Sequence, residues 1–205
     1  MGPICYLVGA GEFSRAFAPA AGDFVIAADG GYDRLRERGL RCDLLIGDMD
    51  SIFAVPTGVE TIRHPVRKDE TDLFLAYREG ARRGYRSFCI YGGGGGREDH
   101  TLANYALLYA ARLGGNDARM ITDAGEATVL KDGEITLSAA GRAGKHFSLF
   151  PIGGAARGVS IRGAEYEAED LVLTLEFPLA VSNRFGKDDV KIAVRDGALL
   201  LWIER

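Results

Sequence analysis

The chain alternates short apolar runs with helical patterns through about its first 120 residues, and this alternation restricts the fold more than any other feature. Six apolar runs predict buried strands: Ile4–Val8, Phe24–Ala28, Leu44–Ile46, Thr61–Arg63, Ser87–Tyr91 and Ala118–Ile121. Helices are predicted from about Tyr32 to Arg38, Asp69 to Arg83 and Asp99 to Leu113. This order favours a Rossmann-like α/β fold, in which a mostly parallel sheet has flanking helices on both faces.

Two of the predicted helices have one apolar face each, which we expect to pack on the sheet. In the second helix these residues are Leu73, Ala76, Tyr77 and Gly80. In the third helix they are Leu102, Ala106, Tyr109 and Leu113. Asp69 is the expected N-cap of the second helix, with Asp72 at its third position, because an aspartate can accept hydrogen bonds from the first N–H groups of a helix.

Helical periodicity disappears after about Asp123. Seven short alternating runs predict strands there: Thr128–Leu130, Ile135–Leu137, His146–Leu149, Val159–Ile161, Leu171–Leu175, Val190–Val194 and Leu199–Ile203. Turn signals, among them Asp132-Gly133 and Asp196-Gly197, separate these runs. The chain is therefore predicted to have two domains, an α/β catalytic domain over residues 1–123 and an antiparallel β-sandwich or barrel over residues 124–205.

Composition excludes several classes of protein. The chain has 25 Lys and Arg against 29 Asp and Glu and no long basic run, so nucleic-acid binding is not expected. No apolar stretch is long enough for a membrane span, and no basic region precedes the first apolar run, so neither a membrane anchor nor a secretory signal is expected. The three cysteines are far apart and lack C-x-x-C spacing, which argues against disulfides and zinc and favours a cytoplasmic protein.

Polar residues and glycines follow the predicted strands where those strands end. Asp29-Gly30-Gly31 follows the second strand, Gly47 to Ser51 the third, and Gly92 to Gly96 the fifth, while Asp69 and Asp72 open the second helix. In an open parallel sheet, ligands bind outside the carboxyl ends of the strands. One such cluster is usually only a tight turn or a helix cap, but four on the same rim favour a functional site.

The pair Asp48 and Asp50 is the first candidate for chemistry. Alternate side chains of an extended segment point the same way, about 7 Å apart, so the two carboxylates can converge on one cation if the loop bends. Oxygen ligands suit Mg²⁺, which is commonly shared between carboxylates and substrate phosphates. Taken alone, the pair is more often a solvated turn after a strand.

The five glycines from Gly92 to Gly96 are the second candidate. Their backbone N–H groups are not obstructed by side chains, and Arg97 adds a charged fork that suits phosphate oxygens. No Gly-Lys-Ser/Thr sequence follows, so this is not a standard P-loop. Gly9-Ala10-Gly11 is not a dinucleotide fingerprint either, because Ser14 replaces its third glycine. The rim therefore predicts a site for Mg²⁺ and a polyphosphate.

Several motifs, in this order along the chain, together resemble the thiamine pyrophosphokinase family. They are Ala28-Asp29-Gly30-Gly31, Gly47-Asp48-Met49-Asp50-Ser51, Lys68-Asp69-Glu70-Thr71-Asp72, Gly95-Gly96-Arg97-Glu98-Asp99-His100, Ser148-Leu149-Phe150-Pro151 and Leu179-Ala180-Val181-Ser182-Asn183. The combination is far more specific than any single motif, and it extends over nearly the whole chain.

The resemblance implies transfer of a pyrophosphoryl group from ATP to the hydroxyl of thiamine, giving thiamine diphosphate and AMP. It also implies a homodimer, with the thiamine site between two chains. Asp48, Asp50 and Asp72 would then hold Mg²⁺, and catalysis would also involve Arg97 and Asp99, between the two substrates. The remaining matched residues would bind substrates: Asp29, Gly30, Gly31, Ser51, Lys68, Asp69, Gly95, Gly96 and His100 on the ATP side, and Ser182 and Asn183 around thiamine.

Some roles stay open at this point. The proton of the attacking hydroxyl could pass to Asp99 or Asp72, or to His100, which could instead only pack in the first turn of its helix. Trp202 could stack on thiamine or simply cover one face of the last strand. Other functions also remain: a Mg²⁺-dependent pyrophosphoryl or nucleotide transferase acting on another alcohol, or a non-catalytic nucleotide-sensing module.

Overall fold

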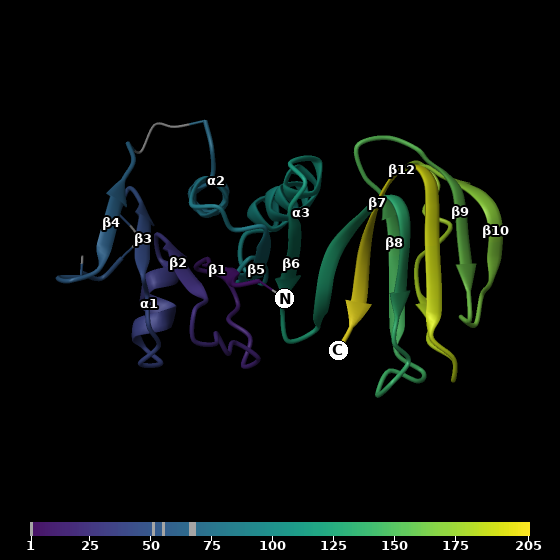
Figure 1. The fold of residues 1–205 in the computed structure, drawn as a ribbon, viewed down its shortest axis with the longest axis horizontal. Helices are drawn as coiled ribbons and strands as arrows, with labels where there is room; N and C mark the ends of the chain where they lie inside the picture. The colour runs from purple at the N-terminus through teal and green to yellow at the C-terminus, as the bar shows by residue number, and fades with distance from the viewer. Residues whose placement is uncertain (1, 51, 55, 66–68) are drawn as a thin grey trace. The chain divides into compact units, whose positions relative to one another are not determined.

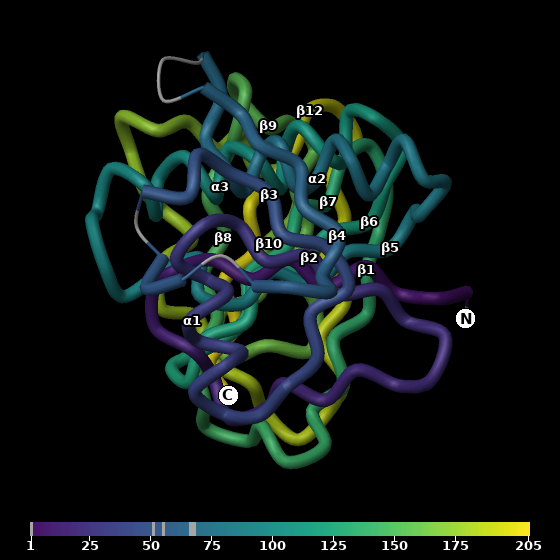
Figure 2. Tube along the Cα trace, turned by 90° about the vertical axis from the view of Figure 1, so that its left-hand side faces the viewer, coloured from purple at the N-terminus to yellow at the C-terminus, as the bar shows by residue number. Residues whose placement is uncertain are grey.

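The computed structural model describes residues 2–50, 52–54, 56–65 and 69–205, and the others are drawn in grey in Figure 2. The fold is mixed α/β, and the chain divides into two compact units that meet in sequence between Asp123 and Ala124. Within the described residues, none of the helices is both long and apolar enough to cross a membrane.

The first unit is built on parallel strands. They are β1 (Ile4–Val8), β2 (Phe24–Ala28), β3 (Leu44–Gly47), β4 (Glu60–Arg63), β5 (Ser87–Tyr91) and β6 (Asp117–Ile121), in the spatial order β4-β3-β2-β1-β5-β6. Each neighbouring pair is parallel, as the alternation predicts. The connecting helices are α1 (Gly31–Arg36), α2 (Asp72–Arg82) and α3 (Glu98–Leu113).

Helices cover both faces of this sheet, and Figure 1 shows α2 and α3 above it and α1 below. On the α1 face, Leu35 belongs to a buried cluster with alternate residues of the strands, including Tyr6 and Val25. On the other face, α2 comes so close that a Cβ on Gly80 would lie 2.8 Å from the ring of Phe88. The apolar face predicted for α2 is buried, and this confirms the prediction.

The start of α2 differs from the prediction. The helix begins at Asp72, and the N-cap is Thr71, whose Oγ1 accepts a hydrogen bond from the N–H of Phe74 at 3.3 Å. Asp69 is therefore not the cap. The hydroxyl of Thr71 satisfies one of the free N–H groups of the first turn, which is the task that the sequence analysis gave to an aspartate.

The face that α3 buries also differs from the prediction. Leu102 and Leu113 are 69% and 56% exposed, so the predicted apolar face points away from the sheet. The buried residues of this helix are Asn104, Leu107, Leu108 and Ala111. A polar residue within the true inner face hid its pattern, because interior positions are normally sought by apolarity alone.

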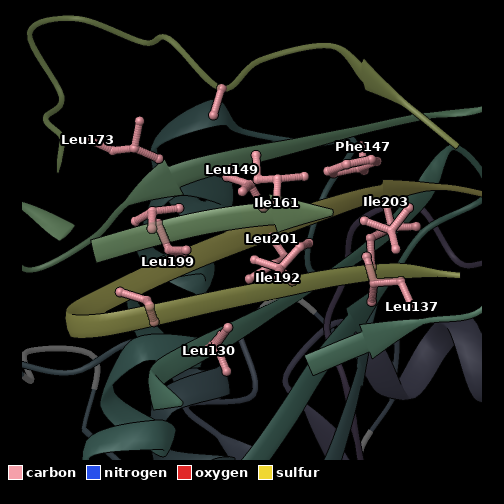
Figure 3. Close-up of a cluster of buried hydrophobic side chains, with 14 of the residues drawn as sticks. Leu130, Leu137, Phe147, Leu149, Ile161, Leu173, Ile192, Leu199, Leu201 and Ile203 are labelled. Atoms are coloured by element: carbon pink, nitrogen blue, oxygen red, sulfur yellow. The ribbon is translucent and has the colours of Figure 1, made fainter. Parts of the chain in front are cut away.

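The second unit is antiparallel. Its strands are β7 (Gly125–Leu137), β8 (His146–Pro151), β9 (Ala156–Arg162), β10 (Ala168–Leu173), β11 (Asn183–Arg184) and β12 (Val190–Glu204). β12 pairs with β7, β8 and β9. Alternate residues of these strands point into one core, in which Phe147, Leu149, Leu199 and Leu201 are at most 1% exposed (Figure 3).

Two predicted turns in this unit are wrong. Asp132-Gly133 and Asp196-Gly197 lie inside β7 and β12, so each long strand replaces two short predicted ones. The pairing of β12 with β7 shifts register between Val194 and Ala198, and Asp132 Oδ1 accepts a hydrogen bond from the N–H of Gly197 at 2.9 Å. These turn residues therefore form an irregularity that bends paired strands without ending them.

Candidate functional site

A pocket of about 350 Å³ lies at the carboxyl ends of β1, β2 and β5 in the first unit. The segments that follow these three strands, the first turn of α2 and the first two turns of α3 line it. The lining residues are Ala10, Gly11, Ala28, Asp29, Gly30, Thr71, Asp72, Leu73, Gly92, Gly93, Gly94, Gly96, Arg97, His100, Thr101 and Asn104. The pocket is thus at the edge where an open parallel sheet binds its ligands.

Two glycine loops form one wall of the pocket. The N–H of Gly11 donates to Gly92 O at 2.9 Å, and the N–H of Glu12 donates to Gly94 O at 2.7 Å. A Cβ on Gly11 would lie 2.3 Å from Gly94 O, so no larger residue fits between the loops. Gly9-Ala10-Gly11, which is not a dinucleotide fingerprint, therefore contains its glycines for close backbone contact.

The second loop keeps backbone donors available. Among the residues that the structure describes, the N–H groups of Gly93 to Gly96 donate no hydrogen bond to the protein. Gly95 has a φ of 72°, and a Cβ there would lie 2.5 Å from the Cβ of Glu12. The glycines thus permit both the left-handed conformation and the open N–H groups that an anionic ligand needs.

Three carboxylates meet at the ends of β2 and β3. One oxygen from each of Asp29, Asp48 and Asp50 lies within 4.8 Å of the other two. The loop between the last two bends at Met49, whose φ is 68°, and the N–H of Asp50 donates to Asp48 Oδ1 at 3.2 Å. The structure therefore brings the predicted pair together and adds Asp29, which the sequence analysis placed among the substrate-binding residues.

Asp72 reaches the same corner from the start of α2. A Cβ on Gly47 would lie 3.2 Å from Asp72 Oδ1 and 3.0 Å from the Cβ of Asp29. Gly47 has a φ of 146° and no side chain, so it leaves room for both acidic residues. Asp72 is thus a neighbour of the three-carboxylate group without being one of its members.

The glycines after β2 have a packing role. Gly30 is the N-cap of α1, and Gly31 is its first residue. A Cβ on Gly31 would lie 1.9 Å from Val8 O, so α1 can start against β1 only with glycine there. Gly30 lines the pocket, whereas the requirement for Gly31 comes from the sheet beneath it.

Arg97 and Asp99 form a two-pronged ion pair at the start of α3. Arg97 Nη2 lies 2.6 Å from Asp99 Oδ2, and Arg97 Nε lies 3.1 Å from Asp99 Oδ1. The hydrogen bonds from Arg97 hold the pKa of the Asp99 carboxyl below its ordinary value, and the N–H of His100 adds to this effect. Arg97 and His100 line the pocket, and both side chains of the pair are largely exposed.

The other residues predicted on the ATP side are placed as follows. Asp69 is exposed and does not line the pocket. Ser51 and Lys68 lie outside the described residues.

In the second unit, Asn183 is 4% exposed and binds backbone. Its Nδ2 donates to Tyr166 O at 2.7 Å, and its Oδ1 accepts from the N–H groups of Tyr166 and Arg184. Ser182 is exposed, has a φ of 61°, and is held through its N–H, which donates to Ser148 Oγ at 3.0 Å. Asn183 thus holds the backbone of this region from within.

Trp202 is half-buried on β12 and packs over Gly125, where a Cβ would lie 2.8 Å from its ring. The glycine provides the space that the indole fills. Trp202 thus covers the start of β7, and its stacking on thiamine stays a prediction.

The sequence analysis missed Thr71, Thr101 and Asn104 as lining residues. Asn104 is the most informative, because it is 4% exposed and its Nδ2 donates to Gly93 O at 2.7 Å. The available signal was its position, two turns after Arg97 and one turn after His100, which places the three on one side of α3.

Two family models match the sequence. Residues 20–121 match the catalytic domain of thiamin pyrophosphokinase, and residues 134–199 match its vitamin B1 binding domain. Together the two matches cover about four-fifths of the chain. Comparison with curated proteins gave no significant match.

Several solved structures share the fold. Thiamine pyrophosphokinase from Bacillus subtilis aligns with a TM-score of 0.83 at 21% identity, over 98% of each chain. A thiamin pyrophosphokinase family protein from Enterococcus faecalis aligns with a TM-score of 0.82 at 20% identity, over 100% of this chain and 99% of the other. Thiamin pyrophosphokinase from Candida albicans gives 0.80 at 17% identity, over 99% of this chain and 89% of the other.

Proposed function

The chain belongs to the thiamine pyrophosphokinase family, and we propose that the pocket at the ends of β1, β2 and β5 binds the ATP of the family's reaction. That reaction transfers the pyrophosphoryl group of ATP to the hydroxyl of thiamine and gives thiamine diphosphate and AMP. One observation supports this assignment of ATP to the pocket. The pocket is lined on one side by Asp29, which belongs to the group of three carboxylates, and on the other by Gly93, in the glycine loop with open N–H groups.

The carboxylate group fits a hard divalent cation. Three oxygens within 4.8 Å of one another offer the ligand type that Mg²⁺ takes, and without a cation their charges would repel. Asp29, Asp48 and Asp50 would hold the ion, with Asp72 beside them. When bound, Mg²⁺ would neutralise charge on the phosphate oxygens and so favour attack at phosphorus.

The phosphates would be held by backbone and by one arginine. The N–H groups of Gly93 to Gly96 and the positive end of α3 favour anionic oxygens. Arg97 can donate to a phosphate, and its ion pair with Asp99 keeps the guanidinium at the mouth of the pocket. Phosphoryl transfer depends mainly on positioning and on charge neutralisation, which these groups provide. Lys68 and Ser51, outside the described residues, remain predicted substrate contacts.

We propose that a residue other than Asp99 accepts the thiamine hydroxyl proton. A carboxylate whose pKa is held low by Arg97 is a weak base, because it binds a proton only at low pH. Asp72 and His100 both line the pocket and remain the candidates for this role. We propose Asp72, because it lies beside the carboxylates that would hold the metal and its phosphates.

We also propose a homodimer whose thiamine site lies between two chains. Support comes from the exposed apolar residues: six of the nine large ones in the described part of the chain fall between Tyr166 and Val181. Apolar residues concentrated in this way are typical of a protein interface. Ser182 follows this segment directly, which places the predicted thiamine-binding residue next to the proposed interface.

We propose that the first unit is a Rossmann-like catalytic domain and that the second is a β-sandwich or barrel that binds thiamine. The parallel order of β1 to β6 and the antiparallel pairing of β7 to β12 support this division. A cytoplasmic location is supported by three free cysteines, two of them buried.

The test is the reaction itself. The purified protein, incubated with Mg²⁺, ATP and thiamine, should form equal amounts of AMP and thiamine diphosphate, which can be measured by chromatography and mass spectrometry. Formation of ADP and thiamine monophosphate would contradict pyrophosphoryl transfer. Binding of ATP without turnover of thiamine would instead support another acceptor or a nucleotide-sensing role.

A further inference from the structure

Asn104 is a buried polar residue at the pocket whose role the family reaction does not explain. The described part of the chain has five buried polar residues: Ser14, Asn104, Asn116, Ser148 and Asn183. Of these, Asn104 is the one that lines the pocket. Its Nδ2 donates to Gly93 O at 2.7 Å, and this bond crosses from the second turn of α3 to the loop after β5. Burying a polar group costs free energy unless it is hydrogen-bonded, and the bond to Gly93 O offsets that cost.

The contact completes a series of three. The carbonyls of Gly92, Gly93 and Gly94 accept hydrogen bonds in turn from the N–H of Gly11, from Asn104 Nδ2 and from the N–H of Glu12. The two outer donors are backbone and belong to the loop after β1. The middle donor is a side chain, so it is the one that a single substitution can remove without changing the backbone.

Holding a carbonyl also orients the next N–H group. A trans peptide unit is planar, with its C=O and the following N–H pointing in opposite directions. The anchored carbonyls of Gly92, Gly93 and Gly94 therefore direct the N–H groups of Gly93, Gly94 and Gly95 away from their anchors. Glycine has the widest choice of backbone conformations, so without anchors this loop would sample many orientations.

We infer that Asn104 is a positioning residue for ATP: by holding Gly93 O, it aims the N–H of Gly94 at a phosphate oxygen of the nucleotide. The inference rests on the proposed function for the identity of the ligand. It assigns Asn104 to nucleotide binding and gives it no contact with thiamine. Preorganised donors bind better because less ordering is needed when the ligand arrives.

Asn116 offers a matched control. It is an asparagine of the same unit, 3% exposed, whose Nδ2 donates to Tyr77 Oη at 2.8 Å, and it does not line the pocket. Replacing either asparagine removes one buried hydrogen bond. Asn104→Ala and Asn116→Ala should therefore lower Tm by similar amounts, and a difference between them in nucleotide affinity would come from the pocket.

The experiment measures the affinity of each full-length variant for α,β-methylene-ATP with Mg²⁺ by calorimetry, together with the KM for thiamine. In this analogue a methylene group replaces the oxygen that bridges the α- and β-phosphorus atoms, so the linkage that the reaction breaks cannot be cleaved. Asn104→Ala and the better-filling Asn104→Leu should weaken analogue binding by about tenfold, the usual value of one oriented hydrogen bond to a charged group. Asn116→Ala should stay within about twofold, and the KM for thiamine should not change in any variant.

Analogue binding by both Asn104 variants within twofold of wild type would overturn the inference. Equal weakening in Asn116→Ala would also overturn it, because the effect would then be a general loosening of the unit. A wild type that binds the analogue but makes no thiamine diphosphate would contradict the proposed function while leaving the Asn104 comparison valid. A wild type that does not bind the analogue would contradict both.

Discussion

Asp29 brings a third carboxylate to the pair of Asp48 and Asp50 from a different strand end. Its φ of 45° lies in the left-handed region, which asparagine tolerates better than most residues. Asp29→Asn should therefore fold normally while losing one charged ligand. We expect the Mg²⁺ concentration for half-maximal activity to rise by about tenfold or more, since a hydrogen bond or ligand involving a charge contributes more than a neutral one.

Asp33→Asn is the control for this variant. Asp33 lies in the first turn of α1, where it pairs with Arg36 and accepts from the N–H of Phe53, and it is not part of the carboxylate group. A Mg²⁺ titration of activity should be unchanged in this variant. An unchanged titration in Asp29→Asn as well would remove Asp29 from the metal site.

At the residue scale, the acidic and glycine motifs could be found from sequence because they interrupt apolar strands with unusual residues. Asn104 and Asn183 could not be assigned in the same way. Each acts on backbone of a segment distant in sequence, Gly93 in one case and Tyr166 in the other. Such partners become visible only when the tertiary structure brings the two segments together.

Among the helices, α2 could be predicted and the inner face of α3 could not. Both predicted faces have helical spacing, but α3 has two competing stripes, and the more apolar one contains Leu102, which is 69% exposed. The other stripe includes Asn104, which hydrophobic periodicity scores as an outer residue. A polar residue that is hydrogen-bonded inside the fold therefore hid the true inner face of α3.

The C-terminal end of α2 has an ion-pair network with a predictable pH dependence. Glu79 accepts hydrogen bonds from Arg82 and Arg83, chiefly from Arg82, and these lower its pKa from an ordinary 4.5 to about 2. Because the folded pKa is the lower one, the network stabilises the folded state fully above about pH 4.5. The stabilisation is lost as the pH falls toward 2.

Glu79→Gln should therefore lower the free energy of unfolding at pH 7 by about 1 to 2 kcal/mol, a value reduced for solvent screening. The difference from wild type should shrink as the pH falls from 4.5 toward 2. Urea denaturation at several pH values measures it. Glu70→Gln is the control, because the Glu70–Arg78 pair is more exposed and should contribute little. A pH-independent difference in Glu79→Gln would contradict the electrostatic origin.

For the whole molecule, the change of periodicity after Asp123 indicated where parallel strands give way to antiparallel ones. The lengths of β7 and β12 could not be predicted from the sequence, because Asp132-Gly133 and Asp196-Gly197 have the composition of turns. In the structure the two pairs face each other across β7 and β12, and Asp132 bonds to Gly197. This hydrogen bond joins two segments that are 65 residues apart, so the sequence around either pair alone does not indicate it.

The proposed homodimer makes a prediction for the assembled molecule. Phe177 and Leu175 are 67% and 68% exposed in the apolar segment between Tyr166 and Val181, and a stable interface should bury them. Phe177→Asp would place a charge inside that interface, so it should shift the protein from dimer to monomer in light-scattering chromatography. Thiamine turnover should fall with it, because the proposed site needs two chains.

Leu113→Asp provides the comparison, because Leu113 is 56% exposed but lies on α3, in the other unit. It should leave both the dimer and the activity intact. Thermal unfolding of both variants shows whether each chain still folds. A fully active monomeric wild type, or a Phe177→Asp variant that stays dimeric, would place the interface elsewhere and free the segment for a different contact.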